Sequence, residues 1–214
     1  LKILLNEIQN IELLKAINIY IVEELSEDQF NFNKDDYSIN LNLIRRTNKI
    51  RSLSASVIDS LEYINTKYLI IMDGDLQHNP NDILNFFKIL KINDSDLIVG
   101  SRNLHEIYKS MKISRVIISK LGNAFAKLFI KQNISDPLTG YFLIKTDYFK
   151  EISKKLEYSG SKILFNILLL KNNINVNEIF IDFRKRKHGK SKLSINWFYY
   201  FLKIIFSNLN VLFK

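Results

Sequence analysis

Two carboxylates stand one residue apart where an apolar run ends. Residues 68–72, Tyr-Leu-Ile-Ile-Met, are followed by Asp73, a glycine and Asp75. Carboxylates at this spacing can converge on one hard cation, and such oxygen ligands suit Mg²⁺ or Mn²⁺ completed by substrate phosphates. Gln77 and His78 could add ligands or orient water. The pattern predicts a metal and phosphate site, while an isolated Asp-x-Asp is also typical of a solvated turn.

Arginines in two further places could bind phosphate. A second apolar run, residues 97–100, is followed by Ser101 and Arg102, and an arginine at such a strand end can pair bidentately with phosphate. Arg115 and Ser119 stand four residues apart, on one face of a predicted helix, where a phosphate could lie across both. A solvated helix face and an ordinary surface arginine are the competing interpretations.

Two loops complete the candidate chemistry. Residues 136–141, Asp-Pro-Leu-Thr-Gly-Tyr, read as a tight turn with a carboxylate, Asp136, at its start. Residues 184–192 hold six Lys or Arg around one glycine, and a flexible cationic loop can close over a pyrophosphate. Nucleic acid is a competing anion, but the loop has no interleaved aromatic residues for base stacking. We therefore expect no nucleic-acid partner.

The net charge of +9 over 214 residues is divided unevenly between the two halves of the chain. Residues 1–107 carry a net charge of −5 and residues 108–214 a net charge of +14, which predicts an anionic partner for the second half. A composition bias toward Lys (24, against 7 Arg) is an alternative source of the excess. The chain has no cysteine, which excludes disulfide scaffolds, thiolate zinc sites and cysteine nucleophiles.

Secondary-structure elements must position these candidate residues. Along the chain, short apolar runs alternate with longer amphipathic stretches. Such alternation is typical of an α/β protein with a mostly parallel sheet flanked by helices, in which ligands bind at the carboxyl ends of the strands. The runs expected as strands are Ile3–Leu5, Ile17–Val22, Ile39–Ile44, Tyr68–Met72, Leu97–Gly100 and Val176–Phe183. The stretches expected as helices are Glu7–Ala16, Leu53–Ile64, Asn81–Ile92, Ser114–Ile130 and Ser161–Leu170, the third with Asn79 as cap and Pro80 in its first turn.

The last segment differs from the rest. Residues 195–213 are apolar and aromatic, with a narrow polar stripe that includes Lys203. A wide apolar face with a narrow polar stripe favours an amphipathic helix in a membrane interface rather than a membrane span, and a helix packed on the core is the alternative. We therefore expect a catalytic domain over residues 1–193 and an interfacial helix over residues 194–214.

Taken in order, these motifs resemble glycosyltransferase family 2, and they are most similar to its dolichol-phosphate mannosyltransferase branch, which makes polyprenyl-phosphate sugars. The resemblance runs from about residue 6 to residue 193. The segments Arg-Ser-Leu-Ser-Ala-Ser-Val-Ile-Asp at 51–59 and Gly-Ser-Lys-Ile-Leu at 160–164 add to it. It implies a GT-A fold, a Rossmann-like sheet that holds a nucleotide sugar, GDP- or UDP-linked, and a divalent metal.

The resemblance also implies a role for individual residues. The metal positions are Asp73, Asp75 and Gln77, and the positions that hold the acceptor phosphate are Arg102, Arg115 and Ser119. The donor positions are Glu7, Glu24, Asp73, Gly74, Arg186 and Lys192, the last two gripping the pyrophosphate. The catalytic positions are Asp75, Asp136 and Arg186, with Asp136 orienting the acceptor loop.

The implied activity is inverting transfer of mannose or a related hexose to polyprenyl or dolichyl phosphate, by a peripheral protein on the cytoplasmic face of a membrane. The N-terminal third departs from the family pattern. The stretch Leu4-Leu5-Asn6-Glu7 lacks the Pro and Tyr that the family has before its first Asn-Glu. Glu23-Glu24 occupies the place of the family's Asp-Asp, and Lys190 replaces a Glu of the cationic loop. Two alternatives follow: transfer to a non-lipid acceptor, and a non-catalytic protein that binds nucleotide sugars.

Overall fold

A computed structural model gives the fold of the chain. It describes residues 1–24, 33–48, 50–104, 113–170, 173–184, 202–206 and 208, apart from the side chains of residues 24, 114 and 115. Within these ranges strands and helices alternate along most of the chain. The predicted α/β class is confirmed.

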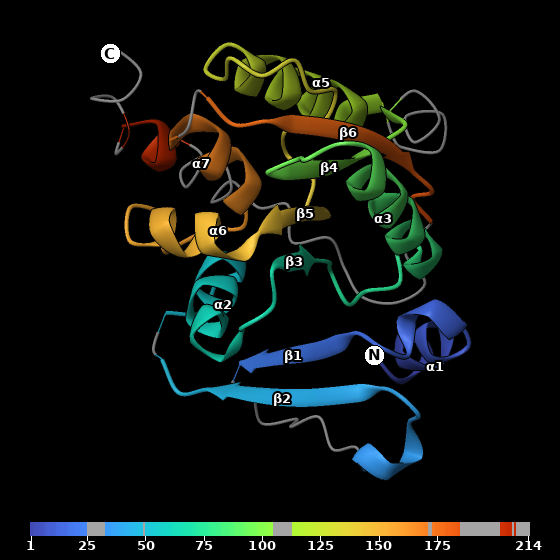
Figure 1. Ribbon diagram of the computed structural model, residues 1–214. Helices are drawn as coiled ribbons and strands as arrows, with labels where there is room; N and C mark the ends of the chain where they lie inside the picture. The colour runs from blue at the N-terminus through green and yellow to red at the C-terminus, as the bar shows by residue number, and fades with distance from the viewer. Residues whose placement is uncertain are drawn as a thin grey trace.

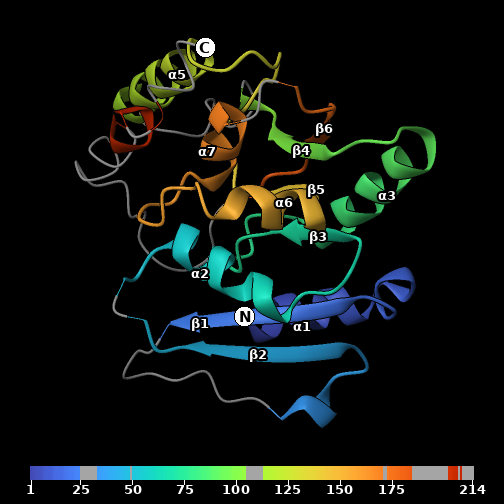
Figure 2. The same ribbon diagram turned by 60° about the vertical axis from the view of Figure 1, so that its left-hand side comes forward.

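The strands of the described part form two sheets. In the smaller sheet β1 pairs with β2 in parallel, and in the larger sheet the order is β3-β5-β4-β6. β6 runs parallel to β4, whereas β5 is antiparallel to both of its neighbours. The bounds are β1 Asn18–Glu24, β2 Asn40–Arg46, β3 Tyr68–Ile71, β4 Leu97–Arg102, β5 Phe142–Lys145 and β6 Val176–Ile181. Figures 1 and 2 show β3 lying between the smaller sheet and the rest of the larger one.

Helices cover both faces of this arrangement. Their bounds are α1 Lys2–Gln9, α2 Leu53–Ser60, α3 Ile83–Ile92, α5 Ile113–Lys127, α6 Thr146–Ser153 and α7 Ile163–Leu170, with short 3-10 turns η1 Glu12–Leu14, η2 Lys34–Asp36, η3 Leu61–Tyr63 and η4 Pro80–Asp82. Successive residues of β4 point to opposite cores, since Leu97 and Val99 join the cluster beneath α2, α6 and α7 and Ile98 joins the cluster beneath α1 and α3. The alternation is that of a sheet buried on both faces.

The N-terminal prediction is wrong in one respect. Ile3–Leu5, expected as a strand, lies inside α1, where Leu4, Leu5 and Ile8 are buried together. Spacings of three and four residues place Leu5 and Leu4 on the same helical face as Ile8, and a run of three apolar residues is too short to separate helix from strand. The helix expected over Glu7–Ala16 is divided between α1 and η1.

Capping side chains set two other boundaries. Asn79 caps η4, which leads into α3, and Pro80 occupies its first turn, as predicted. Ser52 caps α2, because its hydroxyl oxygen accepts from the backbone N–H of Ala55 at 3.0 Å. Both bonds satisfy amides that a first helical turn leaves without intrahelical partners.

The part of the last segment that the structure describes packs against the core. Residues 202–206 are helical, and Ile204 and Ile205 are buried in the core that includes α7. Lys203 pairs with Glu157 at 2.9 Å. Burial raises the pKa of the Glu157 carboxyl, but hydrogen bonds from Ser159 and Lys203 outweigh it and hold that pKa below its usual value. The rest of 194–214 lies outside the described residues apart from position 208, so the interfacial helix stays a prediction.

Among the described helices, none has the length and apolar character that crossing a bilayer requires.

Gly100 lies inside β4, where there is little space for a side chain. A substitution at this position measures how closely the surrounding atoms pack against the strand. A Cβ there would lie 2.9 Å from the Tyr141 carbonyl oxygen and 3.1 Å from the Phe86 ring. We expect Gly100→Ala to lower the free energy of unfolding by about 1–3 kcal/mol, because backbone cannot yield as a flexible side chain can. Denaturant unfolding measures the change.

The matched control is Gly74→Ala, whose Cβ would make an ordinary 3.7 Å contact with Leu1. It should change the free energy of unfolding by less than about 0.5 kcal/mol. Equal losses in both variants would contradict the steric account.

Candidate functional site

The carboxylate turn lies at the carboxyl end of β3, as predicted. Asp73 and Asp75 follow this strand within four residues and are both partly exposed. Leu76, buried beneath the turn, has φ 68°, which an L side chain rarely adopts. The Asp75 carboxylate accepts from the backbone N–H of Gln77 at 3.1 Å. The strained turn therefore holds the two carboxylates and Gln77 on one short arc of backbone.

The 136–140 loop approaches this turn closely. A Cβ at Gly140 would lie 3.1 Å from Oδ2 of Asp73, so the carboxylate rests against bare backbone. The Thr139 hydroxyl donates to the Gly100 carbonyl at 3.0 Å, and the Gly100 N–H donates to the Tyr141 carbonyl at 2.9 Å. The end of β4 thus anchors the loop that brings Gly140 to the carboxylate turn.

Arg102 and Asp136 form a bidentate ion pair. Nε and Nη2 of Arg102 donate to the two carboxylate oxygens of Asp136 at 2.5 and 3.0 Å. Asp136 is fully buried, and the Arg102 side chain is 24% exposed. Charge-assisted bonds of this geometry are strong and directional. The structure therefore pairs the predicted acceptor residue with the predicted loop carboxylate, and the Arg102 guanidinium lies over the Phe183 ring at 5.2 Å.

Lys162 is a site residue that the sequence analysis did not single out. Its Nζ donates to the Leu138 carbonyl at 3.1 Å. Burial lowers the pKa of this ammonium, with the Arg102 charge acting in the same direction, whereas Asp136 and Asp73 act to raise it. Its position in the Gly-Ser-Lys segment at 160–162 was the available signal. Lys162 therefore adds a second basic side chain beside Arg102 and the carboxylates.

Arg184, where the 184–192 loop begins, is hydrogen-bonded to the carboxylate turn. The Arg184 N–H donates to the Gln77 carbonyl at 2.7 Å, and the Gln77 side-chain amide donates back to the Arg184 carbonyl at 3.4 Å. The Arg184 guanidinium pairs with Glu7 at 2.6 Å. Glu7, a predicted donor-binding residue on α1, thus meets the cationic loop where the loop begins.

His78 is buried and lies near the carboxylate turn. Its ring packs against Tyr141 at 4.8 Å and Phe183 at 5.2 Å, and its Nε2 lies 3.8 Å from Oδ2 of Asp73. Desolvation raises the pKa of Tyr141 beyond its usual range, so its phenol stays neutral. The aromatic contacts place His78 in the packing beneath the site.

The remaining predicted residues are placed only in part. Ser119 lies on α5 and is half-buried, and Arg115 belongs to the same helix. Glu24 ends β1. Arg186 and Lys192 lie outside the described residues. In the described ranges no cluster of three or more His, Asp or Glu side chains could by itself hold a metal, so an ion at Asp73 and Asp75 would draw further ligands from elsewhere.

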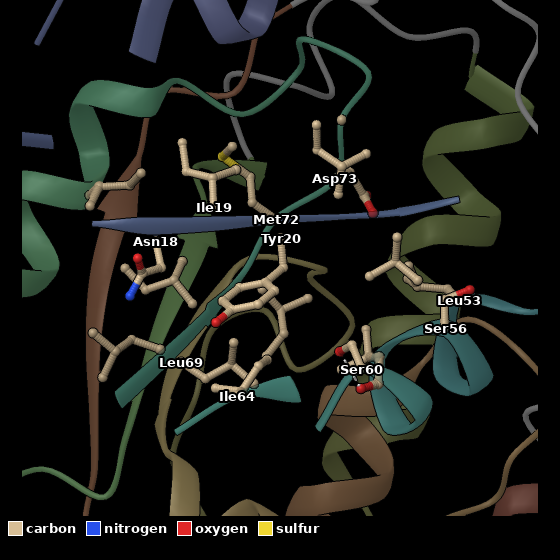
Figure 3. Close-up of a pocket in the computed structure, with 18 of the residues that line it drawn as sticks. Asn18, Ile19, Tyr20, Leu53, Ser56, Ser60, Ile64, Leu69, Met72 and Asp73 are labelled. Carbon is tan, nitrogen blue, oxygen red and sulfur yellow. Dashed lines mark hydrogen bonds between the residues drawn. The ribbon is translucent and has the colours of Figure 1, made fainter. Parts of the chain in front are cut away.

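A cavity of about 1320 Å³ adjoins the carboxylate turn. At one end it reaches Asp73, Gly74 and Lys162, together with Arg51 and Ser52 before α2. From there it continues between β1 and β3, as the labelled side chains of both strands show in Figure 3. A cavity of this volume is large enough for a nucleotide-sized ligand.

A mixed sheet with carboxylates and an arginine gathered where β3 and β4 end is typical of α/β proteins, which bind ligands at the carboxyl ends of their strands. The particular family follows from comparison with known proteins. The model for glycosyl transferase family 2 matches residues 1–153, and the chain belongs to that family.

Two relatives are named dolichol-phosphate mannosyltransferase. That of Pyrococcus furiosus is 31% identical over 173 residues, which cover 77% of this chain and 46% of that protein. That of Saccharomyces cerevisiae is 27% identical over 194 residues, which cover 86% of this chain and 71% of that protein. The chain thus spans about half the length of the first relative and about two thirds of the second.

Solved structures confirm the GT-A fold. Glucosyl-3-phosphoglycerate synthase of Mycobacterium tuberculosis, crystallised with Mg²⁺ and UDP, matches with a TM-score of 0.65 at 9% identity, over 96% of this chain and 74% of that one. The same enzyme with Mn²⁺, UDP and glucosyl-3-phosphoglycerate matches with a TM-score of 0.60 at 10% identity, over 98% and 75%. At these identities the likeness concerns the fold.

Replacing Arg102 tests how much its ion pair with Asp136 contributes to the free energy of unfolding. We expect Arg102→Met to lower the free energy of unfolding by about 3–5 kcal/mol, because it leaves a buried carboxylate without its counter-ion. Adding Asp136→Leu to that variant should restore much of the loss. Denaturant unfolding of the two single variants and the double variant measures the coupling, and strictly additive losses would contradict the pairing.

Proposed function

We propose that the protein is a metal-dependent glycosyltransferase that moves a hexose, mannose or a related sugar, from a GDP- or UDP-linked donor to polyprenyl phosphate, with inversion. The observation that carries the proposal is the meeting of the Asp73–Gln77 turn with the Arg102–Asp136 loop at one sheet edge. The relatives named dolichol-phosphate mannosyltransferase support the acceptor class.

The donor set at the carboxylate turn fits a hard divalent cation. Carboxylate oxygens of Asp73 and Asp75 and the amide oxygen of Gln77 would hold Mg²⁺ or Mn²⁺, with substrate phosphates completing the ligands. Bound there, such an ion offsets negative charge on a diphosphate leaving group. Gly74 gives the donor access beside Asp73, and Glu7, Glu24, Arg186 and Lys192 are proposed to hold the nucleotide and its pyrophosphate.

The acceptor is already an anionic nucleophile. A phosphate oxygen of the lipid bonds to the anomeric carbon of the sugar while the bond from that carbon to the diphosphate oxygen breaks, and the electron pair leaves with the nucleoside diphosphate. In-line attack inverts the carbon. No general base is needed for an ionised phosphate, so the buried Asp136 serves by positioning Arg102, while Arg102, Arg115 and Ser119 hold the acceptor phosphate.

A polyprenyl acceptor requires the protein to work at a membrane surface. The excess of positive charge in residues 108–214 would favour an anionic bilayer. We propose a peripheral protein on the cytoplasmic face, held in part by residues 194–214.

The function is tested by transfer of radiolabelled sugar. Incubation with GDP- or UDP-hexose, Mn²⁺ and polyprenyl phosphate should move label into the lipid phase, and Asp75→Ala should lower the rate by about 100-fold or more, because a ligand of the charge-offsetting ion is lost. Asp35→Ala, at an exposed carboxylate in η2, is the matched control and should retain the rate.

The outcomes separate the alternatives. Label that enters a water-soluble product and not the lipid phase would replace the lipid acceptor with a soluble one. A rise in melting temperature with donor and Mn²⁺ but no transfer to any acceptor would indicate a binding protein. No binding and no transfer with any GDP- or UDP-sugar would overturn the proposal.

A further inference from the structure

One face of α5 carries large apolar side chains that are exposed. Ile113, Ile117 and Leu121 repeat at intervals of four residues, and Leu128 follows directly after the helix ends. Side chains at these spacings share one helical face, and all four are between 52% and 80% exposed. We call them the outer stripe of α5. Figures 1 and 2 show α5 at the end of the molecule opposite the smaller sheet. An exposed apolar face of this extent marks an interaction surface.

The charge around the outer stripe has one sign. Residues 107–135, which include α5, contain six Lys or Arg and no Asp or Glu. Lys120 and Lys127 are exposed, and the helical repeat of 3.6 residues places both along one border of the stripe. An apolar stripe bordered by lysines is typical of a helix that lies in the plane of an anionic membrane surface. The same like charges oppose the pairing of two copies of this face.

The opposite side of α5 is joined to the candidate site. Asn123 is buried, and its side-chain amide donates to the Ser135 carbonyl at 3.4 Å. Ser135 directly precedes Asp136, which pairs with Arg102. Ser119 stands four residues before Asn123 and is half-buried on this inner side of the helix. The helix therefore turns one side to the acceptor loop and the other, the outer stripe, away from it.

We propose that the outer stripe of α5 docks on an anionic bilayer, with its Ile and Leu side chains among the acyl chains and Lys120 and Lys127 at the lipid phosphates. The inference rests on the proposed function in taking a bilayer as the partner. An interfacial helix buries its apolar face by about 5–10 Å, and a helix is about 10–12 Å across. The inner side of α5 then lies at headgroup level. A polyprenyl phosphate would reach Ser119 and the Arg102–Asp136 pair while its chain stays in the hydrocarbon.

A single fluorescent label tests the docking. The chain has no cysteine, so Ile117→Cys gives one site for an NBD label, whose emission brightens and shifts to the blue in apolar surroundings. The matched control is Ile92→Cys, at an exposed position that ends α3. Vesicles of phosphatidylcholine with about 30% phosphatidylglycerol supply the anionic surface. We expect emission at position 117 to rise by about twofold or more with these vesicles, and emission at position 92 to stay unchanged.

A second pair of variants measures how much the stripe contributes to binding. Ile117→Ser combined with Leu121→Ser should lower the partition coefficient onto the same vesicles by about tenfold or more, because two apolar side chains no longer leave water. Leu13→Ser combined with Ile92→Ser, at exposed apolar positions outside α5, should leave it unchanged. Co-sedimentation with vesicles measures the partition coefficient, and equal melting temperatures show that both double variants are folded.

Three outcomes would overturn the proposal. Blue-shifted emission at position 117 in buffer, unaltered by vesicles, would show that the chain itself covers the stripe. Emission that rises with protein concentration in the absence of vesicles would assign the stripe to a second copy. Binding of the protein to vesicles without a change at position 117 would assign the docking to another segment, such as residues 194–214. The vesicles hold neither polyprenyl phosphate nor sugar donor, so docking can fail while sugar transfer succeeds, and the reverse.

Discussion

The arrangement of the site depends on the buried ion pair between Arg102 and Asp136. Arg102 ends β4, and Asp136 opens the loop that leads through Gly140 into β5. The pair, with the bonds of Thr139 and Tyr141 to Gly100, fixes the path of that loop. Gly140 consequently rests against the Asp73 carboxylate at the end of β3. One interaction thereby brings residues from two strand ends and a loop to a common point.

Two carboxylates of the site each form an ion pair with an arginine. Asp136 is matched by Arg102, and Glu7 is matched by Arg184. The Lys162 ammonium donates to the Leu138 carbonyl, and burial together with the Arg102 charge lowers its pKa. An anion that entered the cavity beside Lys162 would favour the protonated ammonium and raise that pKa. The ammonium is thus placed to stabilise negative charge brought by a substrate.

Much of the scaffold could be predicted from sequence, and the contacts within the site could not. The strands β3 and β4 are apolar runs next to Asp73 and Arg102, so the runs of apolar residues in the sequence were sufficient to predict both strands. β5 was missed because its four residues carry no period of their own, and it is buried between neighbours distant in sequence. The Arg102–Asp136 pair and the Gly140 contact join residues far apart in sequence through packing that local patterns do not encode.

The division into two sheets bears on how the site is held together. Glu7 and Glu24 belong to α1 and β1, whereas Asp73 and Arg102 belong to the larger sheet. Between the two sheets the described residues are linked by side-chain packing, by the Glu7–Arg184 pair and by side-chain hydrogen bonds such as that of Asn48 with Tyr158, and the described strands form no backbone ladder there. Ladder hydrogen bonds fix strand positions more directionally than apolar contacts, which are non-directional. The position of Glu7 relative to the carboxylates at the end of β3 therefore depends on side-chain contacts such as the Glu7–Arg184 pair.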